Sequence, residues 1–250
     1  MTAPDLPFFQ TDLFVPVYRP MRRGAWDLRI VEAVLCPGYW SPPSLVRGMA
    51  ALMRGGKTWM STTPLEIESQ EIGVRHARGH VLIFGLGMGW AAAACALRPE
   101  VTAVTVVERD EDVLDLHRDL AVFAQLPDHA RDKVRIEHGD AYAWTARARV
   151  DLLMPDIWLP LVSDGRVEEV RRMQANVRAD AVYFWGQELE IARHAAAARR
   201  DIDPRGVSDM AEAMELPLLG PVLPDYARRV EAVARRWMRG RWLPGTVPPF

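Results

Sequence analysis

The sequence predicts an α/β protein in which helices cover both faces of a parallel sheet, preceded by a small β-containing module. Short apolar runs rich in β-branched residues alternate with helical segments between residues 81 and 185. A glycine-rich turn follows the first run and opens a helix, and acidic residues follow the next runs. Strands that alternate with helices need crossover connections, which give a parallel sheet with two covered faces.

The composition is that of an ordinary globular protein, with 49% hydrophobic and 26% charged residues in a chain of 250. The formal net charge of -2 provides no general attraction to nucleic acid or to anionic membranes. No apolar run reaches the roughly 18 residues of a membrane span, and no signal peptide is recognisable. The two cysteines, Cys36 and Cys95, make no disulfide framework. We therefore expect a cytoplasmic protein.

Residues 1–62 are interpreted as a proline-rich arm followed by a small β module. Residues 26–35 alternate apolar and polar side chains, which predicts a half-buried strand, and residues 57–61 predict a second strand paired with the first. Ser44 is a candidate N-cap for a short helix through Met53, with Gly55-Gly56 as its stop.

Residues 63–250 are interpreted as the main domain. It begins with the capping box Thr63-Pro64-Leu65-Glu66, which predicts a helix to about Ala77. Period and breakers then predict strands at 81–84, 101–107, 134–137, 150–154 and 181–185, and helices at 90–97, 110–126, 141–147 and 166–178. Beyond Gly186 they predict two helices, 187–200 and 225–239, joined by a proline- and glycine-bearing segment, 203–224.

The glycine-rich turn VLIFGLGMG places Gly85, Gly87 and Gly89 between a strand and a helix N-terminus. Such a turn lets a ligand approach the backbone, and the helix start offers free N–H groups. A dinucleotide fingerprint would need glycine at position 90, where this chain has Trp90. The G-x-G-x-G spacing instead favours S-adenosylmethionine as the cofactor.

Two further strand ends add candidate cofactor contacts. Glu108 ends the strand after the glycine turn, where a carboxylate can bind ribose hydroxyls. Asp140, followed by Ala141, ends the next strand and is a candidate partner of the adenine amino group, although aspartate there is also a common turn residue. All three motifs stand at the carboxyl ends of strands, where doubly wound sheets form ligand crevices.

Residues 26–160 resemble the spermidine synthase-like branch of the class I S-adenosylmethionine-dependent methyltransferase superfamily. The resemblance rests on the glycine turn, the strand end VTVVERD, the turn HGDA and the segment VDLLMPDIWLP. It implies a Rossmann-like doubly wound sheet of the class I methyltransferase type, a small N-terminal β module and bound S-adenosylmethionine. Asp156 matches the acid that this branch presents to the reacting atoms, so the resemblance implies a catalytic role for it.

The chain departs from that branch at acidic positions. Met88 and Leu159 stand where spermidine synthases carry aspartates, and Pro64-Leu65 replaces a tyrosine-histidine pair. Loss of these carboxylates weakens the binding of cationic amines, so aminopropyl transfer is disfavoured. Ile83 also replaces the acid that often holds the methionine amino group, for which Gln70, Glu66 and Asp156 are candidates.

The sequence therefore predicts a methyltransferase whose acceptor is unidentified, with a small molecule or a peptide favoured. Asp156 contacts the acceptor or takes its proton, unless it only caps the turn that follows. The alternatives are an aminopropyl transferase that uses decarboxylated S-adenosylmethionine and a catalytically silent scaffold. The aromatic residues Trp158, Trp185 and Tyr183 are expected either in an acceptor pocket or in the core.

The remaining signals are expected to be structural. The histidines are scattered, so no metal site is predicted. The basic C-terminal stretch YARRVEAVARRWMRGRW is interpreted as a solvated helix face with its apolar side on the body, and nucleic acid is an unlikely partner. No membrane association is predicted, and the N-terminal module is a candidate homodimer interface by the same resemblance.

Overall fold

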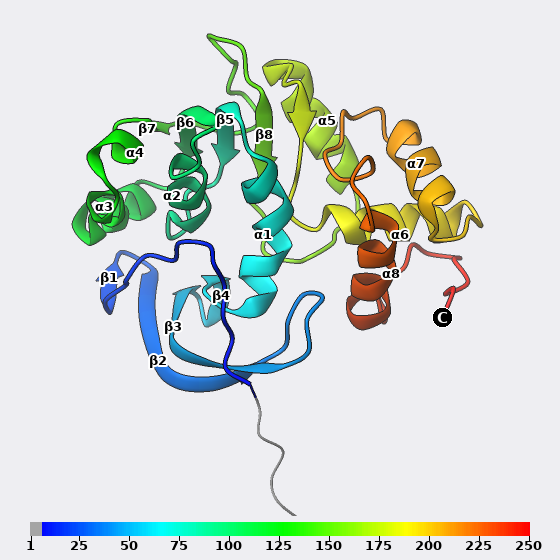
Figure 1. Ribbon diagram of the computed structural model, residues 1–250, viewed down its shortest axis with the longest axis horizontal. Coiled ribbons are helices and arrows are strands. Elements are labelled where there is room, and N and C mark those ends of the chain that lie inside the picture. Colours follow the sequence, from blue (N-terminus) through cyan, green and yellow to red (C-terminus); the bar gives the residue numbers. More distant parts are fainter. Residues whose placement is uncertain (1–6) are drawn as a thin grey trace, which may run out of the picture.

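The computed structural model describes residues 7–250, so the first six residues of the predicted arm lie outside it. The described chain forms an antiparallel sheet, a parallel sheet and a helical C-terminal part (Figure 1). The elements are β1 (Met21–Arg23), β2 (Trp26–Cys36), β3 (Ser44–Arg54), β4 (Lys57–Ser61), α1 (Pro64–His76), β5 (Gly79–Phe84), α2 (Trp90–Ala96), β6 (Val101–Glu108), α3 (Glu111–Leu120), the 3-10 helix Val122–Gln125, α4 (Asp128–Arg131), β7 (Val134–His138), β8 (Leu152–Pro155), α5 (Arg166–Val177), β9 (Ala181–Val182), α6 (Gln187–Ala197), α7 (Pro204–Ala213) and α8 (Tyr226–Trp237).

The parallel sheet has the strand order β7-β6-β5-β8-β9. Its first strand, β5, is central, and the chain runs outward to β6 and β7 on one side before it crosses to β8 and β9 on the other. The order therefore reverses between β5 and β8, which is where doubly wound sheets bind ligands at the carboxyl ends of their strands. The predicted α/β, Rossmann-like fold class is confirmed.

The N-terminal sheet, β1-β2-β3-β4, corrects two predictions. Residues 44–54 form the strand β3 rather than a helix, and β4 pairs with β3 rather than with β2. Gly55 and Gly56, both with positive φ (57° and 76°), form a two-residue hairpin turn that joins Arg54 to Lys57. Such a glycine pair is a strong hairpin signal, and the cross-strand pairing that it starts overrides the helical propensity of the segment.

Two further segments differ from their predictions. Residues 141–147 form no helix: a single turn covers residues 141–143, in which the Asp140 side chain accepts from the N–H of Tyr142, and irregular backbone follows. The predicted connection 203–224 contains α7, whose N-cap Asp203 accepts from Gly206 and precedes Pro204. The start of α1 has the same arrangement of a capping side chain followed by proline: there Thr63 accepts from the N–H of Glu66.

The C-terminal helices pack beside the parallel sheet and reach the loop between β2 and β3. Arg236 donates to the carbonyl oxygens of Gly38 and Ser41, and the indole N–H of Trp237 donates to Tyr39. The Arg229 guanidinium lies over the ring of Trp40. Part of the basic stretch is thus committed to internal contacts. None of the helices among residues 7–250 is long and apolar enough to cross a membrane.

A buried carboxyl group joins these parts. Glu188, on α6 and fully buried, accepts hydrogen bonds from Tyr39 (3.1 Å) and Tyr183 (3.0 Å). The Tyr183 hydroxyl also lies 2.9 Å from the carbonyl oxygen of Ser69 on α1, so its single proton is shared between the two acceptors. Burial raises the pKa of Glu188, against the lowering effect of the tyrosine hydroxyls. One side chain therefore links the β2–β3 loop, the segment after β9 and α6.

Replacement of Glu188 with alanine is expected to destabilise the protein by about 3 kcal/mol, because it leaves buried tyrosine hydroxyls without an acceptor. Glu188→Gln keeps a carbonyl acceptor and is expected to cost less. Urea unfolding of the two variants beside the parent protein measures both losses. Equal stability of Glu188→Ala and the parent would contradict the linking role.

Candidate functional site

A cavity of about 480 Å³ opens at the carboxyl ends of the parallel strands. Its volume lies within the range of small-molecule sites. The cavity lies between the parallel sheet and residues of the N-terminal sheet. Its lining includes the predicted site residues Gln70, Gly85, Gly87, Glu108, Asp140, Ala141 and Asp156, whereas Gly89 and Glu66 lie outside it. The structure thus brings together residues that the sequence spreads over nearly ninety positions.

Gly85 lies where β5 meets the end of β8. Its φ of +96° is in the region that favours glycine, and a Cβ there would stand 2.1 Å from the carbonyl oxygen of Asp156. A side chain at this position would push the two strand ends apart. The same absence of a Cβ leaves the Gly85 backbone in the cavity lining.

The second and third glycines make room for protein side chains. A Cβ at Gly87 would meet the Met60 sulfur at 2.3 Å, and that sulfur also accepts from the N–H of Met88 at 3.0 Å. A Cβ at Gly89, the N-cap of α2, would meet His117 Nε2 at 2.3 Å. Gly89 therefore packs against α3 rather than lining the cavity. Trp90 is fully buried and leaves the cavity open.

Glu108, at the end of β6, accepts three backbone N–H groups. Oε2 accepts from Leu86 in the glycine turn (2.9 Å), and Oε1 accepts from Arg109 and Asp110 (2.8 Å each). A carboxylate offers about four acceptor positions, so Oε2 keeps one for a ligand hydroxyl. Glu108 fixes both loops and still presents an acceptor to the cavity.

Asp140 and Ala141 follow β7 and line the same cavity. Asp140 Oδ1 accepts from the N–H of Tyr142 at 3.0 Å, and the side chain is otherwise exposed. Ala141 is buried beneath it. This end of the cavity is therefore edged by a turn whose backbone and carboxylate are both within reach of a flat ligand.

Asp156 is the acid that directly follows β8. Its Oδ2 accepts from Gln70 Nε2 at 2.8 Å, and the nearby Glu66 on α1 is almost fully buried. Burial raises the pKa of Asp156 to about 7, against the lowering effects of Arg166 and the Gln70 hydrogen bond. Burial and the Asp156 charge raise the pKa of Glu66 well above its usual range. The cavity thus holds one carboxyl group that exchanges its proton near neutral pH.

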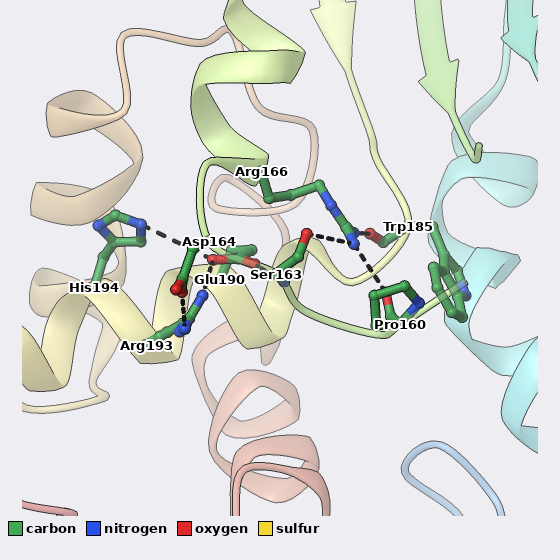
Figure 2. A network of polar contacts seen from close by, with 8 residues as sticks. All are labelled: Pro160, Ser163, Asp164, Arg166, Trp185, Glu190, Arg193 and His194. Carbon is green, nitrogen blue, oxygen red and sulfur yellow. Dashed lines mark hydrogen bonds and ion pairs between the residues drawn. The ribbon is translucent and has the colours of Figure 1, made fainter. Parts of the chain in front are cut away.

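Arg166, the first residue of α5, secures the loop that carries Asp156. It is 1% exposed and donates from Nη2 to the Pro160 carbonyl (2.8 Å) and the Ser163 hydroxyl, and from Nη1 to the Trp185 carbonyl (Figure 2). Farther along the same loop, Glu190 of α6 accepts from the N–H of Ser163. No sequence pattern indicates this role of Arg166, because an arginine at a helix start is ordinarily solvated.

The outer wall comes from the N-terminal sheet and was not anticipated. Trp26 Nε1 donates to Asp110 Oδ2 (3.0 Å), and Arg54 pairs with the same oxygen (2.9 Å). The ring of Trp59 meets that of Trp26 edge to face at 5.6 Å. These residues line the cavity beside Met60. The tryptophans of the predicted strands 26–35 and 57–61 are the sequence feature that could have indicated this wall. The helix predicted at 44–53 prevents that interpretation, because it removes the strand that pairs with both.

The aromatic candidates separate into two groups. Trp158 lines the cavity. Trp185 and Tyr183 are buried in the core, where Trp185 Nε1 donates to Ser69 Oγ at 2.9 Å. Only the first can contact a ligand directly.

Neither a family model nor a curated relative matches the sequence. Among solved structures the chain is similar to the glycopeptide N-methyltransferase MtfA complexed with S-adenosyl-L-homocysteine, at 25% identity over 44% of this chain and 42% of that one, with a TM-score of 0.34. It is also similar to the DhpI-SAM-HEP complex, at 19% identity over 44% and 48%, with a TM-score of 0.33. For the S-adenosylmethionine-dependent methyltransferase SibL in its apo form, the values are 21%, 44% and 31%, with a TM-score of 0.34. The chain aligns with less than half the length of each.

The packing of His117 against the glycine turn predicts acid sensitivity. Its Nε2 has no hydrogen-bond partner among the described residues, and burial lowers the pKa of His117 to about 4. Since the unfolded chain binds this proton near pH 6.5, the stabilisation is complete above pH 6.5 and is lost as the pH falls toward 4.

Between pH 7 and pH 5 this group alone is expected to lower the free energy of unfolding by about 2 kcal/mol. His117→Leu removes the titrating group and should flatten that dependence in urea unfolding. His129→Leu, at an exposed site on α4, is the matched control and should leave the slope unchanged. An unaltered slope in His117→Leu would contradict the assignment.

Proposed function

We propose that the protein is an S-adenosylmethionine-dependent methyltransferase. The observation that carries the proposal is the convergence of the glycine turn, Glu108, Asp140 and Asp156 on one cavity at the point where the strand order reverses. Four successive parallel strands each deliver a different polar or backbone group there. An adenosyl ligand needs that combination, because its sugar, base and charged end are recognised separately.

The residues present fit this cofactor. Glu108 Oε2 has a free acceptor position for a ribose hydroxyl, and Asp140 stands beside it for the adenine amino group. Gly85 and Gly87 offer bare backbone to the remainder, while Gln70 is the candidate partner for its amino group. Met60, a flexible side chain, lies against Gly87 and would shift to admit the ligand. Bound S-adenosylmethionine supplies a methyl group activated by a sulfonium.

The residues of the chain then align the acceptor and remove its proton. Asp156 is the proposed proton acceptor, because its carboxylate lines the cavity and its pKa of about 7 suits proton transfer at neutral pH. Gln70 holds Oδ2 of that carboxylate in place. The outer wall of Trp26, Trp59 and Met60 keeps water away from the reacting groups.

The spermidine synthase-like branch belongs to the same proposal. An antiparallel sheet directly before the parallel one is the arrangement that the resemblance implies, which supports it. Met88, which stands where spermidine synthases carry an aspartate, is buried and lies outside the cavity lining. It therefore provides no carboxylate to bind the cationic amine of an aminopropyl transfer. A cytoplasmic location, a homodimer and the division of the chain at residue 62 stay predictions.

Cofactor binding tests the proposal most directly. Isothermal calorimetry with S-adenosylmethionine and S-adenosylhomocysteine is expected to give saturable binding, and Glu108→Ala should weaken it about 10- to 100-fold, as loss of a charge-assisted hydrogen bond does. Glu100→Ala, in the turn directly before β6 and outside the cavity lining, is the control and should bind normally. No binding at millimolar concentration would favour the silent scaffold, and preference for the decarboxylated cofactor would favour aminopropyl transfer.

The ionisation of Asp156 can be measured without an acceptor. Carbon-13 NMR of the side-chain carboxyl carbons is expected to show one aspartate titrating near pH 7, and Asp156→Asn should remove that signal. Gln70→Ala should raise the midpoint, because it deletes a hydrogen bond to the charged form. A midpoint near the ordinary aspartate value of about 4 would exclude Asp156 as the neutral-pH proton acceptor.

A further inference from the structure

The indole of Trp158 is held on one face and at one edge. The Arg166 guanidinium lies over its ring, 4.0 Å from the centroid, and its Nε1 donates to Glu169 on α5. Trp158 also lines the cavity, two residues after Asp156. The surface left for a ligand is therefore the opposite face of the ring and its far edge.

The guanidinium behind the ring cannot easily move. Arg166 is 1% exposed and donates to three partners, the carbonyls of Pro160 and Trp185 and the hydroxyl of Ser163 (Figure 2). Arg193 of α6 pairs with Asp164 in the following part of the loop. Because these contacts come from the first residue of α5 and from the middle of α6, Trp158 is a fixed platform rather than a mobile surface residue.

We propose that the acceptor is a flat, uncharged aromatic ring that bears a hydroxyl or a ring N–H. It stacks on the free surface of Trp158 and directs its proton to the carboxylate of Asp156. This rests on the proposed methyltransferase function and names the class of substrate that the same cavity takes.

Shape favours an aromatic ring. Trp158 and Tyr142 both line this part of the cavity, and Ile157 lies between Asp156 and Trp158. Stacked aromatic pairs gain stability beyond the area that they bury, and a planar acceptor can lie on an indole and still reach the carboxyl group two residues away.

Charge disfavours a cationic acceptor. A group stacked on Trp158 has the permanent positive charge of Arg166 behind the ring, which repels an ammonium. Because burial raises the pKa of Asp156, its uncharged form provides no negative charge to compensate an ammonium at the same place. An acceptor with a neutral hydroxyl or ring N–H avoids both penalties, and in the proposed reaction Asp156 takes its proton.

Matched probes can test the proposal on the full chain with saturating S-adenosylhomocysteine. Phenol and cyclohexanol differ in the flat ring, and butane-1,4-diamine provides the cationic alternative. Saturation-transfer NMR and calorimetry should show phenol binding about 3- to 10-fold more tightly than cyclohexanol, and more tightly than the diamine. Gly-Tyr-Gly is an additional arm, and tighter binding than phenol would identify the ring as a peptide side chain.

Variants of Trp158 complete the test. Trp158→Leu keeps an apolar side chain and should lose the preference for phenol, whereas Trp158→Phe should keep most of it, with S-adenosylhomocysteine affinity unchanged in both. Trp242→Leu, outside the cavity lining, is the control. Equal or undetectable binding of phenol and cyclohexanol, tighter binding of the diamine, or an unaltered preference in Trp158→Leu would overturn the proposal. If S-adenosylhomocysteine itself does not bind, the methyltransferase function fails and this proposal fails with it.

Discussion

The close approach of two backbones, at Gly85 and Asp156, is the constraint on which the cavity depends. The Asp156 N–H donates to the carbonyl of Phe84 at 2.8 Å, and the Gly85 N–H donates to Val107 at 2.9 Å. Three strand ends are thereby joined by main-chain bonds alone, with no space for a Cβ at residue 85. The side chain of Asp156 inherits its position from this junction, so a change at a glycine would displace an acid on another strand.

Two carboxyl groups in one cavity have different tasks because their surroundings differ. Glu108 receives three backbone N–H groups, which hold its carboxyl group in place as an acceptor. Asp156, which is half-buried at the cavity, receives a single side-chain N–H from Gln70, and its burial raises its pKa to about 7. The two carboxyl groups therefore differ because several loop N–H groups surround Glu108 after β6, whereas side chains of α1 and α5 surround Asp156 after β8.

Sequence patterns predicted most of the elements whose formation depends on interactions between residues close together in the chain. The capping residue Thr63, the β-branched strand 101–107 and the acids at strand ends could be read directly, because cap and strand preferences act over a few residues. The convergence of these motifs on one site could be predicted because the carboxyl ends of parallel strands lie at the same edge of a sheet. The pairing of β3 with both β2 and β4 is not predicted by the sequence, because Gly55-Gly56 is compatible with the end of a helix as well as with a hairpin turn. The part played by Arg166 depends on a loop and a carbonyl 19 residues away, and no pattern within its own helix indicates it.

The N-terminal segment and the β2–β3 loop have consequences for the order of events in folding. Val17 exchanges hydrogen bonds with Gln125, 108 positions along the chain, and Gly38 accepts from Arg236, 198 positions away. Val17 can form its bonds only after residue 125 has been synthesised, and Gly38 only after residue 236. Contacts of such long separation form slowly because the intervening chain must first be closed into a loop. The segments that hold Val17 and Gly38 are therefore expected to reach their final contacts later than strands that pair with near neighbours in the chain.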